Sequence, residues 1–198
     1  MQEEIGKREA ATLARRKHIV EMAALCFIEQ GFHQTSIRDI AGKAGVSLGN
    51  LYNHFDSKVA LIAEIAMLEA EGLARVAKKL QGKGGAIKRV ERFVAAYFDS
   101  LSKPENAVLT AEIMAEAMRN PQVAARFAAN RQGVVTALCA VLQQGRGQGA
   151  FGFEIEPVEM AELLLDMIEA TGMRVAFAKR GQRARAKQAL LAVLRDVL

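Results

Sequence analysis

A short polar stretch, Gly45–Lys58 (GVSLGNLYNHFDSK), interrupts a chain that is otherwise rich in Ala and Leu. Leu51 and Phe55 are four residues apart, so they would anchor one face of a short helix. Tyr52, Asn53 and His54 remain for its outer face, and each can donate a hydrogen bond to a phosphate oxygen or a base edge. Such an element is poor core material. It suits a helix whose outer face reads DNA, with Gly49 allowing the backbone to approach the groove closely.

Other chemistries lack their residue patterns. The sequence contains no Gly-rich phosphate loop, nucleophile elbow, HExxH or CxxC pattern. Its three His do not cluster with Cys or carboxylates at metal-ligand spacing, and we expect its two Cys to be buried thiols. Glu112 and Glu116 lie four apart, but no base or nucleophile pattern accompanies them. We therefore expect no enzyme activity, no cofactor and no metal.

Composition favours a helical protein in a reducing cytoplasm. Of the 198 residues, 51% are hydrophobic and only three are Pro, and no stretch alternates apolar and polar residues as a strand would. The N-terminus is charged, unlike a signal peptide, and no apolar run approaches ~20 residues. The net charge is +5, yet residues 1–58 hold eight Lys/Arg against seven Asp/Glu. Charge alone therefore does not mark the DNA-binding segment.

Apolar periodicity and capping residues predict four helices in the first eighty residues. They cover about 7–30, a segment opening at 35–36, 47–55 and 57–80. Ala41, Gly45 and Leu51 stand where a helix-turn-helix needs a small residue, a turn Gly and an inward apolar residue. The bare spacing fits three unrelated short helices about as well.

The segment Thr35–Lys58 (TSIRDIAGKAGVSLGNLYNHFDSK) resembles the DNA-binding signature of the tetracycline-repressor (TetR/AcrR) family of bacterial transcription regulators. The residues that match the family pattern are Thr35, Ser36, Ile37, Ile40, Ala41, Ala44, Gly45, Val46, Ser47, Gly49, Leu51, Tyr52, His54, Phe55, Ser57 and Lys58. Two positions depart from the family pattern: Leu48 stands where Lys or another polar residue is common, and Asn50 stands where Thr or Ser is usual. These departures bear on the operator sequence and not on the mode of binding.

The resemblance implies a role for each residue of the signature. Bases would be faced by Leu48, Gly49, Asn50 and Asn53. Phosphates would be held by Thr35, Ser47, Tyr52, His54 and Lys58, with Ser36 also in the DNA-binding set. Tyr52 could instead pack partly into the domain, because Tyr has an apolar body. Arg15, Arg16 and Lys17 could be phosphate contacts or a solvated face.

The rest of the chain also reads as helices, over about 86–102, 105–119, 121–144 and 157–179, with a last helix after Gly181 and a loop at 145–152. The predicted fold is all-α. An N-terminal three-helix helix-turn-helix domain (1–56) is joined by a long helix to a C-terminal helical ligand-binding and dimerisation domain (57–198). About nine helices are expected, the number that the resemblance implies.

The last two helices are apolar on more than one face, which calls for a second packing partner. A fully internal position would satisfy that pattern. The resemblance instead implies that both helices pair with their copies in a homodimer, as two-fold operators require.

The resemblance also implies a cavity in the C-terminal domain that binds an unidentified small-molecule effector. The candidate wall residues are Phe93, Tyr97, Glu112, Met114, Met118, Phe127, Met167 and Thr171. Met suits an adaptable apolar pocket, although any single one of these residues could be plain core. Glu112 could meet a cationic ligand, lie on a solvated face or pair with Arg119 or Arg126.

These observations lead to one expectation and two alternatives. We expect a cytoplasmic, homodimeric regulator, a repressor that binds a palindromic double-stranded operator and is released by its effector, with no membrane partner. A helical small-molecule-binding bundle and an interaction adaptor, both without DNA binding, are the alternatives. Neither needs an exposed polar short helix followed by a helix cap that favours anions.

Overall fold

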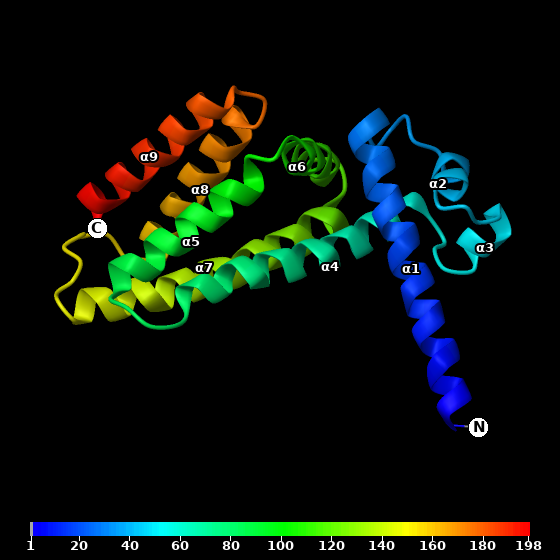
Figure 1. Cartoon of the computed structure of the whole chain (residues 1–198), viewed down its shortest axis with the longest axis horizontal. Helices are drawn as coiled ribbons and strands as arrows, with labels where there is room; N and C mark the ends of the chain where they lie inside the picture. The colour runs from blue at the N-terminus through cyan, green and yellow to red at the C-terminus, as the bar shows by residue number, and fades with distance from the viewer. Residues whose placement is uncertain (1) are drawn as a thin grey trace. The chain divides into compact units, whose positions relative to one another are not determined.

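A computed structural model describes residues 2–198 of the chain, with side chains from residue 6 onward. Within these residues it contains nine α-helices, one 3-10 helix and no strand, which confirms the all-α prediction. The helices are α1 (Gln2–Gln30), α2 (Ile37–Lys43), α3 (Leu48–Tyr52), α4 (Lys58–Ala77), α5 (Ala86–Leu101), α6 (Pro104–Ala117), α7 (Pro121–Gly147), α8 (Pro157–Val175) and α9 (Arg180–Val197) (Figure 1). The 3-10 helix η1 (Lys78–Leu80) follows α4.

The chain forms two compact units, and the boundary between them falls inside helices. The first comprises the chain up to Leu68 together with Leu109–Arg126, and the second comprises Glu69–Val108 and Phe127–Leu198. The division predicted between residues 56 and 57 lies just before α4, within the first unit. The second half of α6 thus groups with the N-terminal helices, which sequence reasoning did not anticipate.

The first unit surrounds a core shared by α1, α2, α3 and the start of α4. Its largest fully buried side chains include Phe27, Ile40, Leu51, Phe55 and Leu61. Among them, Leu51 and Phe55 are the pair that the sequence spacing predicted as the anchor of the short helix. Burial of such side chains contributes roughly 1.5–3 kcal/mol each.

Two glycines permit the turns that this unit needs. Gly31 (φ 81°) follows α1 and Gly45 (φ 63°) follows α2, and a positive φ is strained for residues with a Cβ. The turn at Gly45 was predicted from its spacing with Ala41 and Leu51.

The short helices are held by side-chain caps. The Ser36 hydroxyl accepts from the Asp39 N–H and the Asp39 carboxylate accepts from the Ser36 N–H, which forms a capping box at the start of α2. Ser47 Oγ accepts from the Asn50 N–H at the start of α3, and Ser57 Oγ accepts from the Ala60 N–H at the start of α4. Hydrogen bonds from Ser36 lower the pKa of the Asp39 carboxyl.

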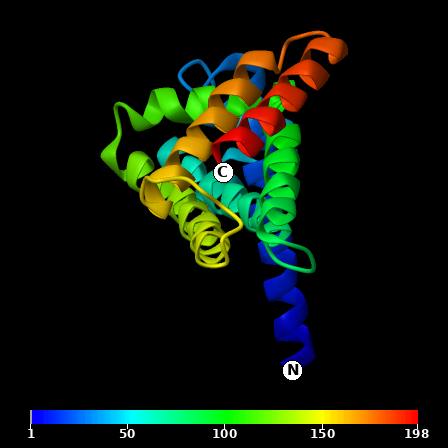
Figure 2. The same ribbon diagram turned by 90° about the vertical axis from the view of Figure 1, so that its left-hand side faces the viewer.

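The second unit packs α5 against α8 and α9, which lie side by side in Figure 2. Phe93, Phe98, Leu138 and Leu164 are among its fully buried side chains. Gly172 lets α8 approach α5 closely, since a Cβ there would lie 2.8 Å from Leu101 Cβ.

The boundary between α8 and α9 differs from the prediction. Helix α8 ends at Val175 and α9 starts at Arg180, so Gly181 lies inside the first turn of α9 instead of breaking a helix. The turn between them is closed by backbone hydrogen bonds, with the Ala178 N–H donating to the Val175 carbonyl. No Gly or Pro marks this turn, so the sequence carried no breaker signal there. Among the described residues, no helix is both long enough and apolar enough to cross a membrane.

Candidate nucleic-acid interface and ligand cavity

Helix α3 presents a polar outer face on a buried apolar anchor. Leu51 is 0% exposed and Phe55 is 1% exposed, so both attach the helix to the unit. The residues of this stretch that are exposed include Ser47, Leu48, Gly49, Asn50, Tyr52 and Asn53. Apart from Ser47, whose hydroxyl caps the helix, their side chains have no hydrogen bond among the described residues that would hold them back from DNA. This face can approach a groove with its polar groups available.

Tyr52 and His54 occupy intermediate situations. The Tyr52 side chain is 49% exposed, so its ring packs partly on the unit while the rest faces solvent. The His54 ring is half-buried, with its centroid 6.4 Å from that of Phe55. Both could place a donor near a phosphate without leaving their packing sites.

Arg15 and Lys17 are exposed, whereas the Arg16 side chain forms hydrogen bonds within the first unit. Its guanidinium donates to the His54 carbonyl at 2.8 Å and to Glu64 Oε1 at 2.7 Å, and lies 4.3 Å from the centroid of the Phe55 ring. Arg16 therefore ties α1 to the end of the α3 segment and to α4. A role as a phosphate contact, one of the two readings of the sequence, does not fit this geometry.

Thr35 does not lie where the resemblance implied. It is 1% exposed, and its hydroxyl donates towards the Gly31 carbonyl at 2.8 Å and lies 3.2 Å from the Cys26 carbonyl. The side chain is thus part of the turn between α1 and α2. This placement is not compatible with a phosphate contact by the Thr35 hydroxyl. The neighbouring Ser36, by contrast, is exposed.

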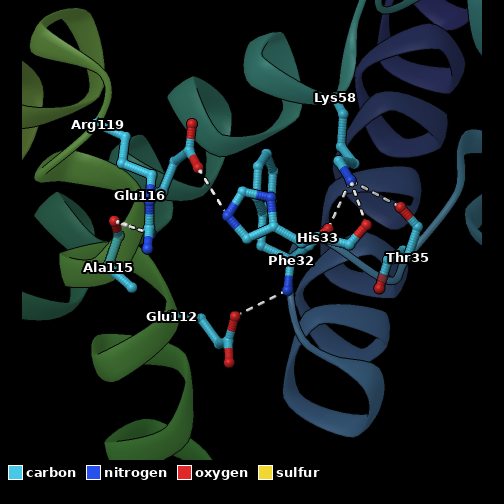
Figure 3. Close-up of polar contacts among 8 residues, drawn as sticks. All are labelled: Phe32, His33, Thr35, Lys58, Glu112, Ala115, Glu116 and Arg119. Atoms are coloured by element: carbon cyan, nitrogen blue, oxygen red, sulfur yellow. Dashed lines mark hydrogen bonds and ion pairs between the residues drawn. The ribbon is translucent and has the colours of Figure 1, made fainter.

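Lys58 is likewise turned inward, as Figure 3 shows. Its ammonium donates to the carbonyls of Phe32 at 2.5 Å, Thr35 at 2.8 Å and His33 at 3.4 Å. An ammonium has three donors, so none is left for a phosphate. It also lies 4.3 Å from the Phe32 ring centroid, and burial lowers the pKa of Lys58. The predicted phosphate contact is therefore replaced by a structural role.

Two carboxylates of α6 hold the same turn from the other side (Figure 3). Glu112 Oε2 accepts from the Phe32 N–H at 2.8 Å. Glu116 is buried, and its Oε2 lies 3.7 Å from His33 Nε2, an ion pair when the imidazole is protonated. Glu112 was predicted in the effector pocket, but here it belongs to the first unit and fixes the turn between α1 and α2.

The other predicted pocket residues are divided between the two units. Phe93 and Tyr97 are buried in the core of the second unit, and Phe127, Met167 and Thr171 are half-buried. Met114 is 51% exposed and Met118 is 83% exposed, both on the surface of the α6 segment. Phe93, Tyr97 and Met167 belong to one core cluster of the second unit, where the ring centroids of Phe93 and Tyr97 lie 5.8 Å apart.

A cavity of about 920 Å³ lies in the second unit between the second half of α4, η1, α7 and Arg89 of α5. It is lined by Ala70, Leu73, Ala74, Ala77, Lys78, Leu80, Gln81, Gly82, Arg89, Ala129, Asn130, Gly133, Val134, Ala137, Ala140, Val141 and Gln144. None of the eight predicted pocket residues is among them. Ala and Gly recur at helical spacing on α4 and α7, a signal of room between helices that sequence reasoning missed.

A partly buried polar cluster adjoins this cavity through Asn130. The Asn130 amide donates to Glu69 Oε2 at 2.9 Å, and burial raises the pKa of the Glu69 carboxyl. The Tyr97 hydroxyl donates to Glu169 Oε1 at 3.0 Å, and burial followed by the nearby Glu169 carboxylate raises the pKa of the phenol. Arg131 pairs with Asp166 and Glu169.

The last two helices carry large apolar side chains on the surface of the described chain. Those on α8 and α9 and in the turn between them that are exposed are Val158, Leu163, Phe177, Val193 and Val197. These side chains have no packing partner within the described chain. This agrees with the sequence, which is apolar on more than one face of both helices. In the part of the chain that the structure describes, no group of three or more His, Cys, Asp or Glu could hold a metal.

Two successive parts of the chain match known protein families. Residues 19–65 match the family of bacterial regulatory proteins named tetR, and residues 86–198 match the C-terminal domain of the BetI-type transcriptional repressors. The first match contains α2 and α3, and the second contains α5 to α9.

Individual relatives match from about a quarter of the chain to nearly all of it. The HTH-type transcriptional regulator UidR of Escherichia coli K12 is 30% identical over 184 residues, 92% of each chain. The HTH-type transcriptional repressor KstR2 of Rhodococcus jostii is 47% identical over 51 residues, 26% of this chain and 25% of that one. The structure of Salmonella enterica GusR superposes with a TM-score of 0.80 at 28% identity, covering 94% of this chain and 96% of that one.

Proposed function

Because the chain belongs to the tetR family of bacterial regulatory proteins, it is a DNA-binding, ligand-responsive transcriptional repressor, and we propose that the outer face of α3 reads its operator. One observation carries this proposal. Polar and small residues of α3 are exposed while Leu51 and Phe55 anchor the helix beneath them. A buried structural helix would show the opposite distribution.

In this proposal, Leu48, Gly49, Asn50 and Asn53 face the bases. Asn can bond adenine through two hydrogen bonds, and the exposed Leu48 can contact a thymine methyl. Phosphates are held by Ser36, Ser47, Tyr52 and His54 around this surface. Lys58 and Thr35 support it from inside by fixing the turn between α1 and α2.

Regulators of this family bind operator DNA and small-molecule effectors as dimers. For this chain we place the two-fold contact on the exposed apolar face of α8 and α9, because that face has no partner within the described chain. Two copies of α3 would then enter successive major grooves about 34–36 Å apart on a palindromic operator.

We also propose that the chain acts by binding alone, without catalysis, in the cytoplasm. An effector would change operator affinity only through its different affinity for the two conformations of the dimer. UidR and KstR2 are named as a regulator and a repressor, which supports a repressor here.

The proposal is tested by titrating the purified protein against labelled DNA from upstream of its own gene, with a random duplex as competitor. Asn50→Ala and Tyr52→Ala should abolish selective binding while circular dichroism and size-exclusion elution stay unchanged. Gln122→Ala, an exposed position on α7, is the matched control and should bind like the parent. Undiminished selective binding by both α3 variants would show that α3 is not the reading helix.

A further inference from the structure

The cavity of the second unit has the size of a small-molecule site. Its volume of about 920 Å³ lies near the upper end of the roughly 300–1,000 Å³ range of ligand pockets. Along α7 it extends from Ala129 to Gln144. That segment of helix spans about 22 Å at a rise of about 1.5 Å per residue. The space is therefore elongated, and an occupant would be long.

Small residues create this space from both sides. On α4 the lining positions Ala70, Ala74 and Ala77 recur every three or four residues, and on α7 Gly133 and Ala137 do the same. Their side chains leave room along the facing surfaces of the two helices. A Cβ built at Gly133 would meet no atom within 4 Å, so this position faces open space. The body of an occupant would lie against hydrocarbon.

The charges at the cavity have one sign. Lys78 and Arg89 line it, and no carboxylate does so among the described residues. Arg89 donates through Nη2 to Gln144 Oε1 at 2.7 Å, but its Nε–H is buried and has no partner in the described chain. An unsatisfied buried donor is costly, and a guanidinium matches a carboxylate with two parallel hydrogen bonds.

From these three observations we infer that the cavity binds an elongated apolar carboxylate, with its acid group at Arg89 and Lys78 and its chain along the Ala and Gly surface towards Asn130. The inference rests on the proposed function in one respect, namely that this molecule is the effector to which the repressor responds. The hydrogen bonds of the acid complete the coordination of the Arg89 guanidinium. The apolar chain displaces water from the facing surfaces of α4 and α7.

Three probes of equal chain length separate charge from hydrophobicity. Dodecanoate, dodecanol and dodecylamine are titrated below their aggregation thresholds, with thermal unfolding and calorimetric binding as readouts. Dodecanoate should raise the unfolding temperature and give a saturable isotherm with one site per chain. Dodecanol should bind at least about tenfold more weakly because it lacks the charge-assisted hydrogen bonds, and dodecylamine weaker still.

Matched pairs of variants locate the site. Arg89→Met and Lys78→Met keep apolar length and remove charge, and each should weaken dodecanoate about tenfold or more. Their neighbours Lys88 and Lys79 do not line the cavity, so Lys88→Met and Lys79→Met should leave the affinity unchanged. Gly133→Leu fills the cavity and should abolish binding, while its unfolding temperature without ligand stays at or above that of the parent, because Leu favours helix over Gly.

Operator binding, measured in the same samples, keeps this inference separate from the proposed function. If all three proteins bind the operator, and dodecanoate releases the parent from it but not Arg89→Met or Gly133→Leu, the carboxylate is established as the effector class. Retained operator binding with no dodecanoate binding, or with equal binding by Arg89→Met and the parent, would overturn the inference alone. If the parent does not bind the operator selectively, the proposed function is refuted. The dodecanoate isotherms of the variants would still decide whether the cavity binds a carboxylate.

Discussion

At the scale of single residues, Lys58 shows how a side chain in a DNA-binding signature can act without touching DNA. The family pattern places it at the start of α4, where a cation beside a helix N-terminus suggests a phosphate contact. The structure instead directs its ammonium to the carbonyls of Phe32, His33 and Thr35. The sequence showed the residue type and its spacing. It could not show the direction of a long side chain, which depends on the turn that packs beside it.

This difference gives a quantitative prediction for Lys58→Met. Loss of the hydrogen bonds should lower the free energy of unfolding by about 1–3 kcal/mol. The slope of log affinity against log salt for the operator should remain that of the parent, measured where the variant is fully folded. If Lys58 holds a phosphate in each half-site, the slope will instead fall by about 0.9 per chain, or about 1.8 for the dimer.

Glu69 provides a second prediction at this scale, in stability against pH. Burial raises the pKa of its carboxyl, so the folded state favours the protonated form. The stability that this group contributes is present below its ordinary pKa and is lost as pH rises through the raised value. The side chain of Glu69→Gln stays neutral at every pH. The free energy of unfolding of this variant, taken relative to that of the parent, should therefore increase as pH rises from about 4 towards neutrality.

Urea unfolding at several pH values measures this effect. Glu71→Gln, an exposed carboxylate on the same helix, is the control and should follow the parent throughout. A difference between Glu69→Gln and the parent that shrinks with rising pH would contradict the assignment of a raised pKa.

At the scale of elements, the caps and turns of the first unit were predictable because they depend on local residues. Ser36 and Asp39 form the capping box, and Gly31 and Gly45 adopt the positive φ that their positions require. The contact of α6 with the turn between α1 and α2 was not predictable, since Glu112 and Phe32 are eighty residues apart. The cavity was missed for the same reason, because it depends on how α4 and α7 face each other.

The role of α6 in holding this turn can be measured directly. Glu112→Ala removes the acceptor of the Phe32 N–H, a hydrogen bond to a charged group worth about 1.5–3 kcal/mol. Amide hydrogen exchange at Phe32 should accelerate, and the free energy of unfolding should fall within that range. Glu105→Ala, an exposed carboxylate at the other end of α6, should leave Phe32 exchange as it is in the parent. Equal protection of Phe32 in both variants would exclude this role for Glu112.

At the scale of the whole molecule, α8 and α9 carry the case for a dimer. Their sequences are broadly apolar, and the structure buries one side of each against α5 while leaving Leu163, Val193 and Val197 exposed. Apolar residues on more than one face of each helix predicted the need for a second packing partner. Identifying that partner as another copy requires the two-fold symmetry of an operator, which lies outside a single chain.

Leu163→Glu tests the dimer at this scale. A carboxylate at the two-fold contact would be desolvated beside its own copy, so the protein should elute as a folded monomer and lose most of its operator affinity. Met118→Glu changes a still more exposed apolar residue outside this face and should remain dimeric. A Leu163→Glu protein that stays dimeric would place the interface elsewhere.

Selection of bound sequences from a random DNA pool tests the central claim most directly, namely that a dimer reads its operator through α3. The account predicts enrichment of one palindromic motif whose half-site centres lie about 34–36 Å apart, one helical turn or a simple multiple of it. Asn50→Ala should lose that motif or change it at the bases that α3 faces. Failure of the parent protein to enrich any motif, or enrichment of an identical motif by Asn50→Ala, would contradict the account.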